Sequence, residues 1–239
     1  MSNLQAPFRL IALKRVNSTN DEIKHAIITR DACHALIVLA EEQVTGRGRR
    51  GCSWVSTIGN LHCSFLLYQS LKFGLISQLA IVMALTVRDA LAELVPTAEF
   101  QIKWPNDILC NKCKISGILL EQEFDFVIVG IGINIIHAPK QRFYPTTCLR
   151  DIGSNVSIID VLFTLCKYVD IWYERWCKDG FSSIHQYYMR HIIGGSMIVK
   201  ITDKMIFDGI FSGIDDDGAL LIDSINGSRK KISTGDVFI

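Results

Sequence analysis

The stretch 126–136, FVIVGIGINII, constrains the fold of this chain more strongly than any other segment. It is apolar and rich in β-branched residues, a composition typical of a strand buried on both faces. Gly130 and Gly132 interrupt the run, and glycine inside a strand marks a bulge or a place where another group closely approaches the backbone. The segment therefore predicts a central strand of a sheet, with a close approach at Gly130 or Gly132.

The flanking patterns predict helices packed on such a sheet. Segment 74–94 repeats apolar residues at helical spacing over a length that can cover one face. Ser157 and Asp160 have the spacing of a helix N-terminal capping box, and the helix is predicted to run past Trp176 and end before Gly180. Further strands are predicted at 8–16, 35–40, 60–68, 100–104 and 116–122, a short helix begins within 17–22, and 136–153 is predicted as a loop.

The pattern changes at about residue 194, where short strands alternate with turn residues. Asp217-Gly218 and Asn226-Gly227 each stand between apolar runs and are strong hairpin signals. The acidic run 215–217 lacks the spacing and the downstream glutamate of a calcium loop, so it is interpreted as a turn. We therefore expect two domains, a larger unit at 1–193 and a small β-barrel-like unit at 194–239.

Composition restricts the function classes. The 239 residues are 49% apolar with a formal net charge of +1, which argues against unselective binding to nucleic acid. The chain opens without the apolar core of a signal peptide and has no run long enough to span a membrane. Eight cysteines without a secretory signal indicate free thiols in a reducing compartment, and Cys110 to Cys113 lacks the second half of a zinc site. We expect a cytoplasmic protein with no membrane or DNA partner.

One local cluster departs from this neutral composition. Residues 46–51, GRGRRG, combine three glycines with three arginines. Glycine lets backbone N–H groups turn towards an anion, and arginine offers bidentate donors to phosphate. The segment is not a P-loop, and although its glycines match the bare dinucleotide-binding spacing, the expected acidic residue is missing. Taken alone, it fits either a phosphate cradle or a solvated basic loop.

Additional motifs separate these alternatives. KWPND at 103–107 is followed by Lys114 and then by SGILLE at 116–121, with VGIGIN at 129–134 further along. Together with GRGRRG and the Ser-Thr-Asn run at 18–20, their order and spacing resemble those of biotin protein ligases, and FDGIFSGIDDDGALLI near the end resembles the small SH3-like domain of those enzymes. The resemblance implies an α+β fold of the class II synthetase-like type. In it, a mixed β-sheet catalytic core with flanking helices precedes a C-terminal SH3-like β-barrel.

The resemblance also implies a reaction in which biotin and ATP form biotinyl-5′-AMP and a lysine of a biotin carboxyl carrier protein then receives the biotin. Joining two anions requires cations between them, a role that the resemblance gives to Lys114 and Arg49 as catalytic residues. It implies biotin contacts from Ser18, Thr19, Asn20, Gln43, Gly46, Arg47, Gly48, Lys114 and Gly117. It implies contacts to ATP or the adenylate from Arg47, Arg49, Arg50, Gly51, Trp54, Asn106, Asp107, Lys114 and Asn134. Mg²⁺ is expected mainly on phosphate oxygens, with Asp107 as a candidate ligand.

Some alternatives stay open at this stage. Ser18 to Asn20 fit a plain helix N-cap as well as a ligand site, and Trp54 fits an ordinary core residue. Cys52 stands where the family usually has a basic residue, which removes one expected phosphate contact. A lipoate or octanoate ligase of the related fold and a non-catalytic biotin-sensing module are the competing functions. The catalytic pattern begins so early that we expect no DNA-binding domain, and a homodimer paired near the VGIGIN strand is an open alternative.

Overall fold

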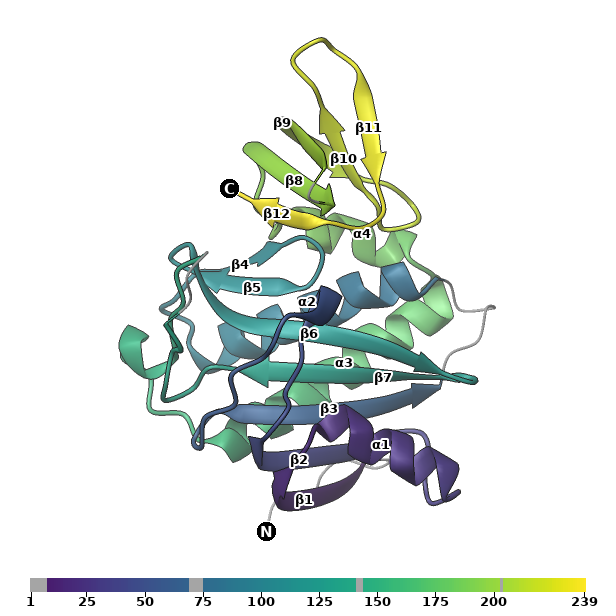
Figure 1. Cartoon of the computed structure of the whole chain (residues 1–239), viewed down its shortest axis with the longest axis vertical. Helices are drawn as coiled ribbons and strands as arrows, with labels where there is room; N and C mark the ends of the chain where they lie inside the picture. Colours follow the sequence, from purple (N-terminus) through teal and green to yellow (C-terminus); the bar gives the residue numbers. More distant parts are fainter. Residues whose placement is uncertain (1–7, 69–74, 141–143, 203) are drawn as a thin grey trace.

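The computed structural model describes residues 8–68, 75–140, 144–202 and 204–239. Its larger sheet has seven strands in the order β1-β2-β3-β7-β6-β5-β4 (Figure 1). β1 and β2 are parallel and the remaining neighbours are antiparallel, so the sheet is mixed, as predicted. The strands are β1 (Arg9–Val16), β2 (Leu36–Gln43), β3 (Leu61–Tyr68), β4 (Phe100–Lys103), β5 (Asp107–Cys110), β6 (Cys113–Glu123) and β7 (Phe126–Ile133).

β7 is the middle strand of this sheet, which confirms the prediction from its composition. Val127, Val129 and Ile131 face one hydrophobic cluster, and Ile128 faces a second cluster on the opposite side. Because β3 and β6 pair with both edges of β7, the strand cannot pair with another copy of the chain. The edge strands of the sheet are β1 and β4, and Ile102 of β4 also bridges to Ile192. β7 itself thus offers no free edge, and a homodimer formed near the VGIGIN strand stays a prediction.

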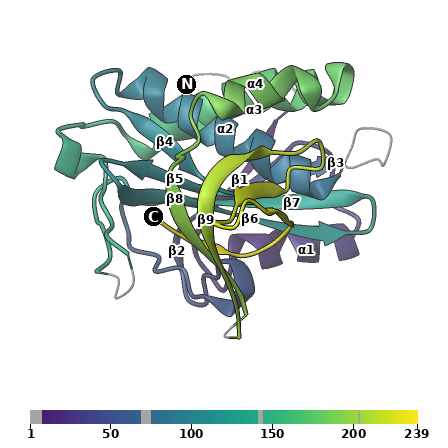
Figure 2. The same cartoon turned by 90° about the horizontal axis from the view of Figure 1, so that it is seen from above.

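Helices cover both faces of the sheet (Figure 2). α2 (Ile76–Leu94) packs against α3 (Ile158–Asp179) on one face, and α1 (Thr19–Ile28) covers β2 and β3 on the other. The capping box of α3 is present, since the Ser157 hydroxyl accepts from the backbone N–H of Asp160 at 3.2 Å and the Asp160 carboxylate accepts from that of Ser157 at 3.1 Å. The predicted start of α2 at residue 74 lies outside the described residues. α4 (Ser182–Met189) was not predicted.

The C-terminal residues form a separate antiparallel sheet in the order β11-β10-β9-β8-β12. Asp217-Gly218 and Asn226-Gly227 make the two predicted hairpin turns, with Gly218 and Gly227 at φ 83° and 79°. The Asp215 carboxylate accepts from two backbone N–H groups of the first turn and pairs with Lys231 at 2.6 Å. The strands are β8 (Ser196–Thr202), β9 (Met205–Ile214), β10 (Leu220–Asp223), β11 (Arg229–Ile232) and β12 (Asp236–Phe238).

The cysteines are free thiols. Cys110 and Cys113 face each other across the β5–β6 hairpin, whose turn residues Asn111 and Lys112 have φ of 50° and 62°. Positive φ at both central residues is the signature of a tight two-residue hairpin, so the C-x-x-C spacing belongs to a turn. Within the described ranges, no helix is both long and apolar enough to cross a membrane.

Candidate functional site

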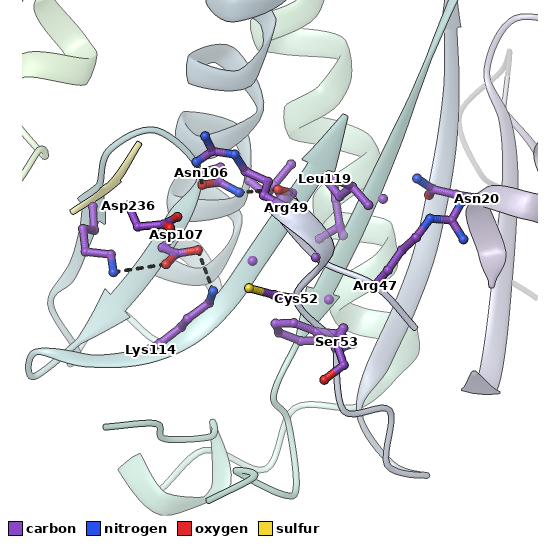
Figure 3. Close-up of a pocket in the computed structure, with 18 of the residues that line it drawn as sticks. Asn20, Arg47, Arg49, Cys52, Ser53, Asn106, Asp107, Lys114, Leu119 and Asp236 are labelled. Atoms are coloured by element: carbon purple, nitrogen blue, oxygen red, sulfur yellow. Dashed lines mark hydrogen bonds and ion pairs between the residues drawn. The ribbon is translucent and has the colours of Figure 1, made fainter. Parts of the chain in front are cut away.

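A pocket lies between the large sheet, the basic loop and the C-terminal sheet (Figure 3). Most of the residues predicted for the site meet there, although they come from segments far apart in the sequence. The predicted residues that line it are Ser18, Thr19, Asn20, Gln43, Arg47, Gly48, Arg49, Trp54, Asn106, Asp107, Lys114 and Gly117. The pocket therefore has polar groups from α1, β2, β5, β6 and the loop after β2.

Two lysines share one carboxylate at one end of the pocket. The ammonium of Lys114 lies 2.7 Å from Asp107 Oδ1, and that of Lys103 lies 3.3 Å from Asp107 Oδ2. The strand pairing explains this, because Asp107 begins β5 opposite Lys103 on β4, and Lys114 stands on the adjacent β6. Burial alone would raise the pKa of Asp107, but the Lys114 and Lys103 ammoniums hold it below its ordinary value. One carboxylate against two ammoniums leaves this end with a net positive charge.

An aromatic wall stands beside Lys114. Its ammonium lies 5.8 Å from the ring centroid of Trp54 and 5.2 Å from that of Tyr144, both within range of a cation–π contact. Trp54 lies directly over β7, because a Cβ added to Gly132 would come within 2.3 Å of its ring. The indole N–H donates to Nδ1 of buried His62 at 3.4 Å, and His62 Nε2 lies 3.3 Å from the Thr57 carbonyl. Burial lowers the pKa of His62, which favours the neutral ring that this arrangement needs.

The opposite end of the pocket has neutral hydrogen-bonding groups. Gln43 Oε1 accepts from the backbone N–H of Thr19 at 2.9 Å and from its hydroxyl at 3.1 Å, while Gln43 Nε2 donates to Ser56. Asn20 packs on β7, since a Cβ on Gly130 would lie 2.5 Å from Asn20 Oδ1. Ser18 occupies the N-cap position of α1, yet its side chain makes no capping hydrogen bond. The hydroxyl and amide groups of this run are thus not consumed by helix capping.

Arg47 connects the basic loop to this neutral end. Its guanidinium forms a bidentate pair with Asp21, at 2.8 and 2.6 Å, and also contacts Glu121 at 3.0 and 3.2 Å. The hydrogen bonds from Arg47 hold the pKa of Asp21 below its ordinary value. Burial would raise the pKa of Glu121, but its bonds to Arg47 and Asn20 lower it. In Figure 3 Arg47 accordingly points towards Asn20 and away from Lys114.

The other two arginines of the loop point in different directions. Arg49 enters the pocket and donates to Asn106 Oδ1 at 3.1 Å. Burial lowers the pKa of Arg49, partly offset by the Asp236 and Asp107 carboxylates. Arg50 lies outside the pocket and contacts the C-terminal sheet. The structure therefore directs three arginines that lie within four residues of the motif to different partners.

Four predicted residues do not line the pocket: Gly46, Arg50, Gly51 and Asn134. Gly46 packs against the backbone of Trp54, because a Cβ there would lie 2.7 Å from the Trp54 carbonyl oxygen. Asn134 directly follows β7, is buried, and donates to the Thr147 carbonyl at 3.0 Å. Its Oδ1 has no hydrogen-bond partner within the described part of the chain.

Other lining residues were not predicted as site residues. They include Lys103, Trp104, Ser53, Cys63, Tyr144 and the C-terminal residues Gly235, Asp236, Val237 and Phe238. Lys103 could have been found, because it opens the KWPND motif. The C-terminal group could not, because only the pairing of β12 with β8 brings it to the pocket. Cys52 is exposed at the pocket, in the position that lacks the basic residue usual in the family.

The pocket can accept an anion at the lysine end and a neutral polar group at the other. Its lining carboxylates, Asp107 and Asp236, both have cationic partners. Within the described residues no group of three His, Cys, Asp or Glu side chains could hold a metal ion. A magnesium ion, which keeps waters and phosphate oxygens as ligands, fits this donor set only as a companion of a phosphorylated substrate.

Comparison with known proteins gives consistent matches. Residues 12–135 match the biotin/lipoate A/B protein ligase family, and residues 189–239 match the biotin protein ligase C-terminal domain. The chain is 34% identical to the biotin–[acetyl-CoA-carboxylase] ligase of Paracoccus denitrificans, over 95% of this chain and 98% of that protein. It is 29% identical to the Mycobacterium tuberculosis ligase of the same name, over 96% and 88%. The solved biotin protein ligase of Aquifex aeolicus in complex with biotin and ATP superposes with a TM-score of 0.85 at 30% identity, covering 96% of this chain and 97% of that one.

Proposed function

The chain belongs to the biotin/lipoate A/B protein ligase family, and we propose that its pocket carries out both half-reactions of a biotin protein ligase. In the first, a biotin carboxylate oxygen attacks the α-phosphorus of ATP, the bond to the β-phosphate oxygen breaks, and pyrophosphate leaves. In the second, the amine of a carrier lysine attacks the acyl carbon of biotinyl-5′-AMP. An amide forms, AMP leaves and the amine loses a proton.

Lys114 is the cation between the two substrates in this proposal. Asp107 holds its ammonium at 2.7 Å and so orients it towards the pocket, where Lys103 adds a second positive charge. Preoriented cations in a site shielded from water stabilise the charge that develops on the phosphate oxygens without reorganising during the reaction. MgATP is the form of nucleotide expected; its phosphate oxygens would hold the metal, and Asp107 is the candidate protein ligand.

Biotin fits the opposite end. Its ureido group has two N–H donors and one carbonyl and needs neutral partners. Ser18, Thr19, Asn20 and Gln43 provide hydroxyl and amide groups of that kind. Arg47 and Gly48 also line the pocket, with Arg47 held at the neutral end by Asp21 and Glu121, and Arg49 with Asn106 is assigned to the nucleotide side.

The observation that carries the proposal is the coexistence of these two ends in one pocket, with Lys114 beside Trp54 at the lysine end. A lipoate or octanoate chain has no use for the neutral donors and acceptors around Gln43, which favours biotin over the sister substrates. A pure biotin sensor has no need for two lysines at the junction of the substrates. The carrier domain of a biotin-dependent carboxylase is the proposed acceptor.

The test is isotope exchange between pyrophosphate and ATP by the purified protein with Mg²⁺, adding biotin, lipoate or octanoate in separate reactions. Exchange that depends on biotin is expected, because the first half-reaction is reversible without any carrier. Preference for lipoate or octanoate would assign the chain to the sister activity. Absence of exchange with every acid, combined with measurable biotin binding, would favour the sensor.

A further inference from the structure

Arg50 is anchored to the C-terminal sheet rather than directed at the substrates. Its Nη1 donates to the Lys200 carbonyl and to Asp236 Oδ2, each at 2.9 Å, and its Nη2 donates to the Ile201 carbonyl. Lys200 and Asp236 are direct partners in the pairing of β8 with β12. One guanidinium therefore binds both strands at the point where they pair.

The backbone of the basic loop is shaped for this split. Arg50 has φ 55°, in the left-handed region that a residue with a Cβ seldom adopts, and Gly51 follows at φ 78°. The Gly48 N–H donates to the Cys52 carbonyl at 2.7 Å and the Cys52 N–H to the Arg49 carbonyl at 3.1 Å, which closes a tight turn. This turn sends the side chains of Arg49 and Arg50 in different directions.

Arg49 is held by groups on both sides of the cleft. Its guanidinium donates to Asn106, which follows β4, and to Thr234 Oγ1 at 3.4 Å, just before β12. The next residues, Gly235 and Asp236, line the pocket themselves. The segment from Thr234 to Asp236 thus contacts the two neighbouring arginines and forms part of the pocket wall.

We propose that Arg50 is a positioning residue, which fixes the basic loop to the C-terminal sheet so that Arg49 stays aimed at the nucleotide. This inference rests on the proposed function for the identity of the nucleotide. The C-terminal sheet thereby controls the affinity for ATP and the retention of the adenylate. The biotin end is held by hydrogen bonds among α1, β2 and β3 in which Arg50 takes no part.

A direct phosphate contact from Arg50 is the competing role. The two roles differ in what they require of Asp236. For a phosphate ligand, the neighbouring carboxylate competes with the nucleotide, so its removal should leave ATP binding unchanged or improve it. For a positioning residue, Asp236 is part of the anchor, so its removal should weaken ATP binding as the loss of Arg50 does.

The test measures the KM for ATP and for biotin separately in pyrophosphate exchange. Arg50→Ala is expected to raise the KM for ATP by roughly tenfold, the scale of losing charge-assisted hydrogen bonds, and to leave the KM for biotin unchanged. Asp236→Asn should also raise the KM for ATP, but by less. The double variant Arg50→Asp with Asp236→Arg exchanges the two charges and should have a lower KM for ATP than Arg50→Asp alone. Arg229→Ala removes an ion pair with Asp223 on the distal hairpin and is the matched control, with both constants unchanged.

A second measurement does not depend on activity. Trypsin cleaves after Arg49 and Arg50 when the loop leaves the sheet, and Asp236→Asn retains both cleavage sites. Faster cleavage of this variant than of the wild type and of Arg229→Ala is expected, whether or not biotin proves to be the substrate. Equal cleavage rates, or a KM for ATP that Asp236→Asn leaves unchanged or lowers, would overturn the anchoring role. If the wild type shows no biotin-dependent exchange but trypsin still cleaves Asp236→Asn faster, only the proposed function is rejected and the anchoring role of Arg50 stands.

Discussion

At the scale of single residues, the ion pairs of Asp107 show that the fold can tolerate the loss of Lys114 although the proposed reaction cannot. Asp107 has two ammonium partners, of which Lys114 is the closer at 2.7 Å. Removal of one lysine leaves the carboxylate paired with the other, so the fold does not depend on Lys114 alone. The proposed chemistry does, because Lys114 is the cation that also contacts the Trp54 wall.

Lys114→Gln is therefore expected to lower biotin-dependent pyrophosphate exchange by on the order of 10²-fold or more, the usual effect of removing a preoriented charge-stabilising group. Lys112→Gln is the matched control, since Lys112 lies two residues away, exposed in the β5–β6 turn. Thermal unfolding of both variants checks that the fold is retained. Normal exchange by Lys114→Gln would remove this lysine from the mechanism.

His62 makes the stability depend on pH. Burial lowers its pKa from the ordinary value of 6.5, so the folded chain keeps the ring neutral while the unfolded chain protonates it. The unfolded state then binds more protons, and the free energy of unfolding falls as the pH drops below about 6.5, by at most about 1.4 kcal/mol per pH unit for one group. Asp170, whose pKa burial raises to about 6, acts in the opposite direction.

Comparison of variants isolates the contribution of His62. Urea unfolding at pH 7.5 and 5.5 should show a larger loss of stability for the wild type than for His62→Gln, because Asp170 and the other groups contribute equally to both. The glutamine side chain of this variant still offers an oxygen to the Trp54 indole N–H, which limits other changes. The same pH dependence in both proteins would show that folding leaves the pKa of His62 unchanged, contrary to this prediction.

At the scale of elements, β7 explains how the two ends of the pocket are kept apart. Gly130 and Gly132 stand two residues apart and so point to the same face of the strand. Gly130 leaves room for Asn20, since a Cβ there would lie 2.5 Å from Asn20 Oδ1. Gly132 leaves room for Trp54, since a Cβ there would lie 2.3 Å from the indole ring. The close approach predicted from the sequence occurs at both positions, and side chains rather than backbone make it.

Alanine at these two positions should therefore give different kinetic defects. Gly130→Ala displaces Asn20 and is expected to raise the KM for biotin with little change for ATP. Gly132→Ala displaces Trp54 and is expected to act mainly on the KM for ATP. Each variant is the control for the other, since both add one methyl group to the same face and cost about 1–3 kcal/mol of packing strain. Equal effects of both variants on both substrates would indicate only a general distortion of β7.

Elements with a strong local signal were predictable and those fixed by tertiary pairing were not. The capping box and Gly180 gave the bounds of α3, and apolar composition gave β7. β5 and β12, with four and three residues, are too short for a periodic pattern, and each exists because a neighbouring strand pairs with it. The eight-residue α4 was missed because it follows α3 after a short interruption at Gly180.

The same distinction applies to the site. The resemblance of the motifs to those of biotin protein ligases pointed to Lys114 and Gln43, and the structure brings both into one pocket. The direction of each loop arginine could not be predicted, because it depends on acceptors far along the chain. These acceptors are Asp21 and Glu121 for Arg47, and Asp236 for Arg50. The predicted adenylate contact from Arg50 is untested, and its position favours the anchoring role.

At the scale of the whole molecule, the β9–β10 turn fastens the C-terminal sheet to the catalytic core. The Trp104 indole N–H donates to the Gly218 carbonyl at 3.0 Å, the Ser77 hydroxyl to that of Asp217, and Gln78 Nε2 to that of Asp216. Buried residues of both sheets also belong to one hydrophobic cluster. The predicted boundary between 193 and 194 therefore separates two sheets that share a hydrophobic core. A shared core favours unfolding of both sheets together.

We expect one cooperative unfolding transition for both sheets, because opening the C-terminal sheet alone would expose the shared apolar surface and break these hydrogen bonds. Native-state hydrogen exchange measures this directly: the amides of Leu220 and Ile222 in β10 should open with the same free energy as that of Val129 in β7. Markedly lower values in β10 would show that 194–239 is an independently unfolding unit. Because residues 235–238 line the pocket, bound ATP would in that case protect β10 more than β7, whereas a single cooperative unit gains protection equally in both strands.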